Sequence, residues 1–258
     1  NSILERLKVV SGAVNVAVCE NDEDIASVVE RCRPNLVIHT ACVYGRALES
    51  WVNIFDANVR LGLVILDTLR RMDTPVTFIN TGTSLDGNTS PYAMSKELFT
   101  NFCRNFTATP ESKIKFINVV MEHMYGPGDD VSKFSSHVIH QCYKNISKLD
   151  LTWGAQKRDF IYIDDVVAAY SVIIQNLSSF HFGENIGVGC GSAPSIKEFV
   201  EKVKLITNSS TELCFGVHPY RQHEPMHSVA NISTLSALGW APYHDLNSGL
   251  SRFIELES

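Results

Sequence analysis

Short apolar runs alternate with longer amphipathic stretches through the first half of the chain. Compact runs of aliphatic residues predict strands, whereas apolar residues recurring every three or four positions predict helices. The pattern predicts four strands, at residues 13–19, 35–41, 76–82 and 114–120. It predicts helices between them, at residues 22–32, 54–72 and 91–106.

The predicted strands are almost continuously apolar, which is typical of strands that are covered on both faces. We therefore expect a parallel sheet with helices on each side, that is, a doubly wound α/β fold with right-handed crossovers. After Val120 the alternation breaks at the loop "EHMYGPGDD". The later helices, short strands and long loops predict a smaller region packed over the carboxyl ends of the strands, where such sheets bind ligands.

The sequence lacks a motif that usually opens a dinucleotide-binding sheet. Such a sheet begins with a strand, a G-x-G-x-x-G turn and a helix, and this chain contains no such turn. We expect a Rossmann-like sheet without its first strand, turn and helix. Two explanations stay open: the chain is part of a longer protein, or it is a natural variant without the phosphate-binding turn.

Composition and charge exclude several classes of function. The net charge of -6 leaves no basic block to neutralise nucleic-acid phosphates. No apolar run approaches the ~18 residues of a membrane span, and the N-terminus lacks a signal-peptide layout. The seven cysteines are scattered without a CxxC pair, which favours reduced thiols in a cytoplasmic protein and argues against a metal site.

The segment "PYAMSKELF" carries the first candidate chemistry. Tyr92 and Lys96 are four residues apart, so on a helix they share one face. A nearby ammonium favours the phenolate, so we expect Lys96 to lower the pKa of Tyr92 toward a value useful for proton transfer. An ordinary amphipathic helix with a polar rim is the less favoured reading.

The segment "FINTGTSL" precedes this helix and ends a predicted strand. It presents Thr81, Thr83 and Ser84 at the carboxyl end, where a hydroxyl could donate a hydrogen bond to a substrate carbonyl oxygen. A tyrosine and a lysine at this spacing are a weak signal alone. The hydroxyl-rich strand end in an alternating β/α chain makes the signal considerably stronger.

From about Val14 to its end, the chain resembles the extended short-chain dehydrogenase/reductases that act on nucleotide sugars, and most of all a reductase branch of that family. The resemblance rests on "NLVIHTA", "DANVRLGLVILDTL", "PYAMSK", "EHMYGPGDD", "KRDFIYIDDVVAAY" and "LGWAP". It implies a cofactor-binding domain at residues 1–120, to which residues 155–180 return. The remainder, residues 121–258, is then mainly a substrate-binding region.

The resemblance implies a role for each matching residue. Tyr92 is then the general acid, Lys96 its partner and a ligand of the nicotinamide ribose, and Thr83 the group that binds the keto oxygen. Thr81 is the rival for that last role. The other cofactor-site positions that the family implies are His39, Thr40, Ala41, Asn58, Tyr125 and Gly126.

Two of these positions have competing structural explanations. His39 ends an apolar strand, so its side chain is most simply a buried structural histidine. Asn58 lies in a predicted helix and packs under the cofactor site or is exposed to solvent, with nearly equal support.

The resemblance also implies substrate contacts. Glu122 and His123 stand where relatives often have an asparagine that touches the substrate phosphates. Arg158 and Arg221 match two arginines that clamp a pyrophosphate, and guanidinium groups suit that task. For Arg158, a structural salt bridge to Asp159, Asp164 or Asp165 is about equally supported.

The adjacent carboxylates Asp164 and Asp165 are better explained as the start of a helix than as an acid/base pair.

The implied reaction is the NADPH-dependent reduction of a 4-keto group on a CDP-linked deoxyhexose. NAD is possible instead of NADPH, because the residues that would read the ribose belong to the missing unit. A 4-epimerase with tightly bound NAD and an impaired nucleotide-sugar-binding protein are the alternatives. Dehydration is disfavoured, because Ser84 and Leu85 stand where an acid/base pair is needed. The family also implies a homodimer.

Overall fold

The computed structural model describes residues 14–222 and 224–257. The helices are α2 (Asp22–Cys32), α3 (Trp51–Phe55), α4 (Leu61–Met72), α5 (Pro91–Thr107), α6 (Phe134–Tyr143), α7 (Ile163–Gln175), α8 (Ile196–Ile206), α9 (Ser233–Ala237) and α10 (Leu246–Glu257). One π-helical turn, at Asp56–Arg60, joins α3 to α4, and 3₁₀ turns lie at Gly87–Thr89 and Leu177–Ser179. The strands are β1 (Leu36–His39), β2 (Val76–Thr83), β3 (Ile114–Met121), β4 (His123–Tyr125), β5 (Lys148–Asp150), β6 (Phe160–Tyr162), β7 (Glu184–Val188) and β8 (Glu212–Cys214).

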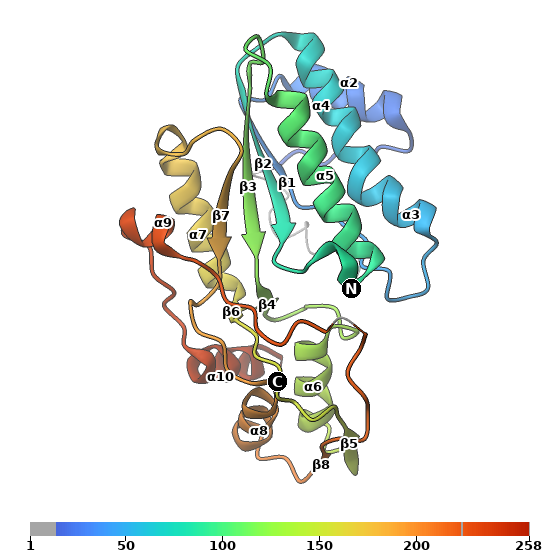
Figure 1. Ribbon diagram of the computed structural model, residues 1–258, viewed down its shortest axis with the longest axis vertical. Coiled ribbons are helices and arrows are strands. Elements are labelled where there is room, and N and C mark those ends of the chain that lie inside the picture. Colours follow the sequence, from blue (N-terminus) through green and yellow to red (C-terminus); the bar gives the residue numbers. More distant parts are fainter. Residues whose placement is uncertain (1–13, 223, 258) are drawn as a thin grey trace.

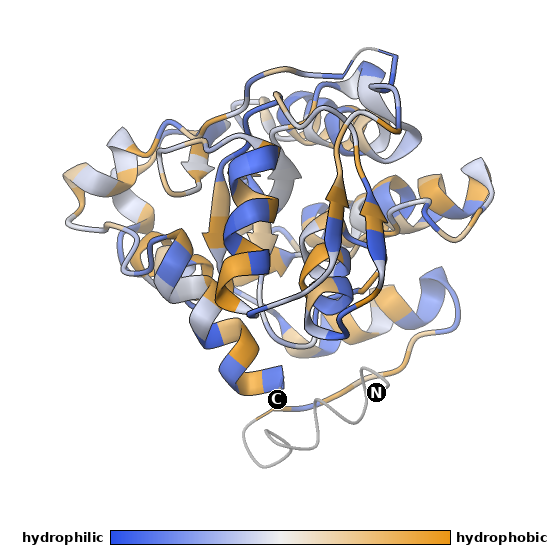
Figure 2. Ribbon diagram, turned by 90° about the horizontal axis from the view of Figure 1, so that it is seen from below, coloured by the Kyte–Doolittle hydropathy of each residue, from blue (hydrophilic) through white to orange (hydrophobic). Residues whose placement is uncertain are grey.

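A four-stranded parallel sheet in the order β1-β2-β3-β7 forms the centre of the molecule. Helices α4 and α5 cover one face and α7 covers the other, as Figure 1 shows. The expected doubly wound α/β fold is therefore confirmed. The strands are drawn mainly in hydrophobic colours in Figure 2, while the surrounding helices are two-toned, because each helix buries only one stripe of its surface.

Each face of the sheet has its own hydrophobic core. Phe78, Phe99 and Phe116 belong to the core under α4 and α5, and Ile79 and Ile117 to the core under α7. Successive side chains of β2 point to opposite faces, so neighbouring residues enter different cores. This is why the strand reads as an unbroken apolar run.

The predicted strand at residues 13–19 is wrong over the part that the structure describes. Residues 14–19 form no strand, and Val14, Val16 and Val18 are exposed. A strand needs a neighbour that takes up its backbone hydrogen bonds, and no strand of the described chain pairs with this segment. The segment has the apolar pattern of a strand, but it has no partner here.

The second half of the chain packs below the carboxyl ends of β2 and β3 (Figure 1). Helices α6, α8 and α10 enclose a third core that includes Tyr125, Phe160, Phe199 and Phe253. Strand β7 and helix α7 return to the main sheet. The assignment of cofactor and substrate roles to the two regions stays a prediction.

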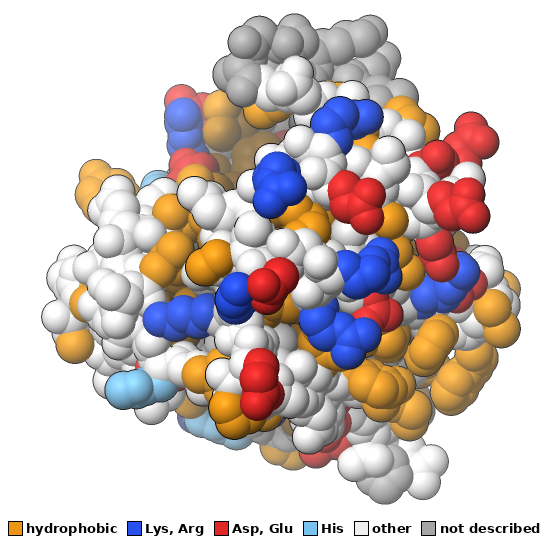
Figure 3. All heavy atoms as spheres, turned by 90° about the horizontal axis from the view of Figure 1, so that it is seen from above, with side chains coloured by type: hydrophobic (Ala, Val, Ile, Leu, Met, Phe, Trp, Pro, Cys, Tyr) orange, Lys and Arg blue, Asp and Glu red, His pale blue; other side chains and the backbone are white. Residues whose placement is uncertain are grey.

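The described charged side chains form no single-sign patch on the face seen from above (Figure 3). On the face seen in Figure 3, basic and acidic side chains are interspersed. No helix in residues 14–222 or 224–257 is long and apolar enough to cross a membrane.

Candidate active site

Thr83 and Tyr92 meet at the carboxyl end of β2. The strand ends at Thr83, and α5 begins at Pro91 after Ser90, whose hydroxyl accepts a hydrogen bond from the Ala93 backbone amide at 3.2 Å. This N-cap fixes the first turn of α5, so the phenol of Tyr92 is held against the strand end. The Thr83 side chain lies near enough to the Tyr92 phenol to lower its pKa.

Thr81, the rival of Thr83, is engaged elsewhere. Its hydroxyl is hydrogen-bonded to the hydroxyl of Tyr170 on α7, across the opposite face of the sheet. Of the two threonines, Thr83 is therefore the one that interacts with Tyr92, and its catalytic role stays a prediction.

Lys96 lies one helical turn after Tyr92 and is only 2% exposed. Its ammonium has no hydrogen-bond partner among the described residues. Burial lowers the pKa of Lys96, and the nearby Cys42 partly opposes this effect. A buried charge without a partner is costly. The three N–H donors of the Lys96 ammonium are therefore available to a ligand at the site.

The expected lowering of the pKa of Tyr92 is wrong. Burial raises the pKa of the Tyr92 phenol, and the charge of Cys42 adds to this, whereas Thr83 and Arg46 lower it. The desolvation of the phenolate outweighs the nearby positive charge. Tyr92 is therefore fully protonated at neutral pH, which suits a proton donor.

Asn58 is completely buried, so the solvent-exposed alternative for this residue is wrong. Its Oδ1 accepts from the Val43 backbone amide at 2.7 Å, and its Nδ2 donates to the Val43 carbonyl at 2.9 Å and to Ser95 Oγ at 2.8 Å. The side chain therefore fastens the loop after β1 to helix α5, beside Tyr92 and Lys96.

That loop brings three residues to the site that sequence reasoning missed. The Tyr44 ring lies 4.8 Å from the Tyr92 ring, and the Arg46 guanidinium lies 4.8 Å from the Tyr44 ring centroid. Cys42 acts electrostatically on Tyr92, Tyr44 and Lys96. Their position just after a parallel strand was a usable signal, because the carboxyl ends of β1 and β2 share one edge.

His39, Thr40 and Ala41 end β1 and begin this loop. Thr40 and Ala41 are exposed, whereas His39 is 4% exposed and lies against the rings of Phe78 and Phe99. Burial and the charge of Lys96 lower the pKa of His39 to about 4, although its hydrogen bond to Asn80 opposes this. The imidazole is therefore neutral at physiological pH.

Glu122 and His123 lie where β3 passes into β4. The Glu122 carboxylate is buried and accepts hydrogen bonds from Ser228 Oγ at 2.8 and 3.0 Å. His123 Nδ1 lies 3.5 Å from that carboxylate, and the ring packs edge-on against Phe160. Of the two, His123 is the more accessible to a ligand.

The two candidate arginines differ in their surroundings. Arg158 is buried and forms an ion pair with Glu224, so the alternative partners Asp159, Asp164 and Asp165 are wrong. Arg221 is exposed in the loop after β8 and makes no ion pair with any described residue. Asp164 and Asp165 lie in the first turn of α7, as predicted.

Tyr125 and Gly126 are not brought to the catalytic cluster by any described contact. Tyr125 is buried in the third core against Tyr162, and Gly126 lies against Ile163. Their assignment to the cofactor site stays a prediction.

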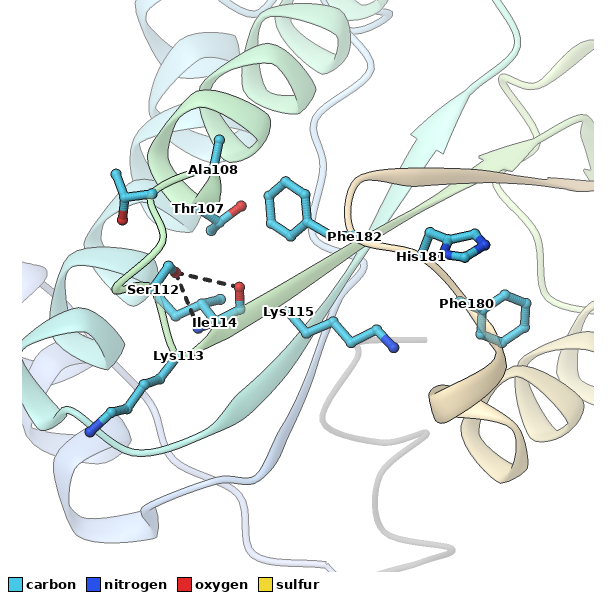
Figure 4. Close-up of a pocket in the computed structure, with 10 residues that line it drawn as sticks. Thr107, Ala108, Ser112, Lys113, Ile114, Lys115, Phe180, His181 and Phe182 are labelled. Atoms are coloured by element: carbon cyan, nitrogen blue, oxygen red, sulfur yellow. Dashed lines mark hydrogen bonds between the residues drawn. The ribbon is translucent and has the colours of Figure 1, made fainter.

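Two hollows flank α5. One, of about 410 Å³, includes Thr83, Lys96 and Thr100 in its lining and so adjoins the catalytic cluster. The other, of about 440 Å³, lies at the amino end of β3 (Figure 4). Its two lysines are already bound, Lys113 to Asp73 and Lys115 to the Leu177 carbonyl, so it offers no comparable chemistry.

The parallel doubly wound sheet, with the candidate threonine–tyrosine–lysine cluster at its carboxyl edge, is typical of NAD(P)-dependent enzymes of the oxidoreductase type. The model of the NAD dependent epimerase/dehydratase family matches residues 4–189, and the chain belongs to this family.

Individual proteins agree with this assignment. The chain is 34% identical to CDP-abequose synthase from Salmonella typhimurium over 85% of this chain and 75% of that protein. The expected family resemblance is thereby confirmed. Two solved structures share the fold. UDP-glucose 4-epimerase from Thermus thermophilus in complex with NAD has a TM-score of 0.78 at 19% identity, covering 98% of this chain and 94% of that one. RMD from Pseudomonas aeruginosa complexed with NADPH has a TM-score of 0.76 at 17% identity, covering 98% and 96%.

Proposed function

We propose that the protein reduces a 4-keto group on a CDP-linked deoxyhexose with NADPH, in the synthesis of a surface polysaccharide precursor such as O-antigen. The observation that carries this proposal is the buried Lys96 ammonium, which has no hydrogen-bond partner among the described residues and lies one helical turn after Tyr92, whose phenol interacts with Thr83. The similarity to CDP-abequose synthase supports the choice of nucleotide and sugar.

The residues present fit the ribose of a nicotinamide cofactor. The Lys96 ammonium has three donors and no described partner, and ribose hydroxyls are suitable acceptors. The exposed Thr40 and Ala41 lie at the same edge of the sheet and would border the cofactor. When bound, the reduced nicotinamide supplies the hydride for the carbonyl carbon.

Side chains of the protein supply the proton that the reduction requires. The Tyr92 phenol donates its proton to the carbonyl oxygen as that oxygen gains negative charge, and Thr83 donates a hydrogen bond to the same oxygen. The phenolate left behind is stabilised by the positive charge of Arg46 and by Thr83. Asn58 bonds both to Val43 and to Ser95 of α5, and so holds the loop that bears Cys42 and Tyr44 beside these groups.

The diphosphate of the substrate would be held by the second region of the chain. Arg221 lies exposed in its loop and forms no ion pair with any residue that the structure describes, so its guanidinium can bind phosphate oxygens. His123 is the second candidate contact. Arg158 and Glu122 would act mainly by supporting these side chains, because their charged groups are already paired or hydrogen-bonded.

The decisive experiment is a turnover assay on the purified protein. We expect it to be isolated without bound nicotinamide and to oxidise added NADPH when given a CDP-4-keto-deoxyhexose. Tyr92→Phe, which removes one hydroxyl, should retain the fold and lose at least about a hundredfold in kcat. Near-normal activity in that variant would remove Tyr92 from the mechanism.

Two other outcomes would assign a different function. Stoichiometric NAD in the purified protein, with interconversion of 4-epimers, would identify an epimerase. Tight binding of the nucleotide sugar without turnover would identify a binding protein on the same scaffold.

We further propose that the protein is a homodimer that buries α3 and α5. Met94, Leu98 and Phe102 form an exposed apolar stripe along α5, and Trp51 and Phe55 are exposed on α3. Apolar stripes of this kind are typical of subunit interfaces. Light scattering should give about twice the chain mass of 28.7 kDa, and a monomer at micromolar concentration would contradict the proposal.

A further inference from the structure

A row of polar side chains crosses the central sheet from edge to edge. The pairing register places His39 of β1 opposite Asn80 of β2, Asn80 opposite Asn118 of β3, and Asn118 opposite Asn185 of β7. The first three are buried, while Asn185 is exposed at the far edge. Polar side chains in the middle of a buried sheet are costly unless every one is hydrogen-bonded.

The four residues are joined by an unbroken chain of hydrogen bonds. Asn118 Nδ2 donates to Asn185 Oδ1 at 2.8 Å, and Asn80 Nδ2 donates to Asn118 Oδ1 at 2.9 Å. His39 Nδ1 lies 3.3 Å from Asn80 Oδ1. Gly82 of β2 leaves the necessary space, because a Cβ at that position would lie 2.8 Å from Asn118 Oδ1.

The direction of this chain is set at the protein surface. Arg104 on α5 approaches Asn185 Oδ1 at 2.7 Å, and a guanidinium can only donate. The Asn185 atom that it contacts is therefore the oxygen. The atom of Asn118 that faces this oxygen must be a donor, and the same reasoning passes to Asn80.

Thr100 on α5 supports the same direction independently. Its hydroxyl donates to the Lys96 carbonyl at 2.9 Å, so its oxygen is left to accept from Asn80 Nδ2 at 3.3 Å. Arg104 as a donor and Thr100 as an acceptor, both on α5, thus place the Asn80 oxygen toward His39. His39 must then carry its proton on Nδ1, which leaves a lone pair on Nε2.

That lone pair and the Lys96 ammonium are complementary. His39 Nε2 and Lys96 Nζ are both buried and both lack a hydrogen-bond partner in the described chain. One can only accept and the other can only donate. The two groups interact electrostatically, and buried polar groups that lack a protein partner are typical sites for a bridging water.

We propose that the asparagine row fixes His39 as the Nδ1–H tautomer, and that His39 is a positioning residue whose Nε2 accepts a hydrogen bond from Lys96 through one bridging water. The proposal rests on the proposed function only in giving Lys96 a catalytic task. His39, oriented by the three asparagines, then holds the Lys96 ammonium in place from the side of the sheet. The other two N–H donors of Lys96 face the ligand.

The titratable groups around this pair are few. Lys96 is the charged group that acts on His39, whose ring is otherwise enclosed by Phe78 and Phe99. Cys42, in the loop after β1, is the titratable group that acts on Lys96. A neutral His39 adds no positive charge to this cluster, so it can support the ammonium without repelling it.

Nitrogen-15 NMR of the imidazole in the wild-type protein tests the tautomer without any assay of activity. Comparison with His39→Gln identifies the signals. We expect a neutral Nδ1–H ring that does not protonate until the pH falls to about 4. An Nε2–H tautomer, or an imidazolium at pH 7, would overturn the proposal even if the protein proves to be a reductase.

A matched pair of variants tests the link to Lys96. Asparagine reproduces the Nδ1 side of histidine, which contacts Asn80, whereas glutamine can place a polar atom where Nε2 lies. The Lys96 signal is followed by NMR of lysine-labelled protein and identified by its loss in Lys96→Met.

In His39→Asn we expect the pKa of Lys96 to fall further and NADPH to dissociate about tenfold more readily, as for the loss of one hydrogen bond to a charged group. His39→Gln should restore much of both. Equal effects in the two variants, or no effect in either, would show that His39 only fills space. Should His39→Asn not fold, the tautomer measurement on the wild-type protein still decides.

Discussion

Lys96 and Arg158 are both buried cations, and the fold treats them in opposite ways. Arg158 is 4% exposed and donates to the Glu224 carboxylate and to the Lys157 carbonyl. Lys96 is 2% exposed and has no described partner for its ammonium. The first arrangement is complete without a ligand, whereas the second is not.

This difference indicates that Arg158 has a structural role and that Lys96 has a role in binding or catalysis. Burying an unpaired ammonium disfavours its charged form and costs stability. We therefore expect such a group to gain a partner when a ligand binds. A cofactor ribose and the lone pair of His39 would accept the hydrogen bonds that the Lys96 ammonium can donate. Arg158, by contrast, contributes by joining β6 to the loop that carries Arg221.

Lys96→Met should produce the largest effect. Removal of the ammonium should lower kcat by about a thousandfold, within the range for a group that assists proton transfer. The same change should raise the free energy of unfolding at pH 7 by about 1–3 kcal/mol, because a buried unsatisfied group is lost. Denaturant unfolding and steady-state kinetics measure the two effects.

The stability gain should depend on pH in a definite direction. The folded pKa of Lys96 lies below its unfolded value, so the unfolded state binds more protons between the two values, and wild-type stability rises with pH through that window. The advantage of Lys96→Met should therefore shrink as the pH approaches the ordinary lysine pKa. A variant that is less stable than the wild type at pH 7 would mean that Lys96 has a structural partner.

Sequence patterns predicted the features of the fold and the candidate site that depend on local geometry. The helix at Asp22–Cys32 was predicted with its bounds, and the spacing of Tyr92 and Lys96 placed them on one face of α5. The strand end at Thr83 followed from the parallel sheet. These features depend on periods of two and four residues, which a single sequence displays.

What could not be predicted depends on contacts between distant residues. The pairing of Arg158 with Glu224 joins positions 66 residues apart, and no pattern favours Glu224 over the three nearby aspartates. Burial of the Tyr92 phenol reversed the expected pKa shift, and Tyr44, in the loop after β1, packs against the Tyr92 ring. The path of that loop is set by Asn58, whose side chain looked equally suited to solvent.

Arg158→Met gives the smaller effect and tests the other half of the comparison. Loss of the guanidinium leaves the Glu224 carboxylate unpaired at a mostly buried position, so the free energy of unfolding should fall by about 3 kcal/mol. The double variant Arg158→Met/Glu224→Leu should recover most of this loss, because a hydrophobic pair can replace a buried ion pair. Denaturant unfolding of the single and double variants gives the coupling directly. If Arg158→Met instead leaves stability unchanged and raises only the KM for the nucleotide sugar, then Arg158 contacts the ligand, and the contrast between the two cations fails.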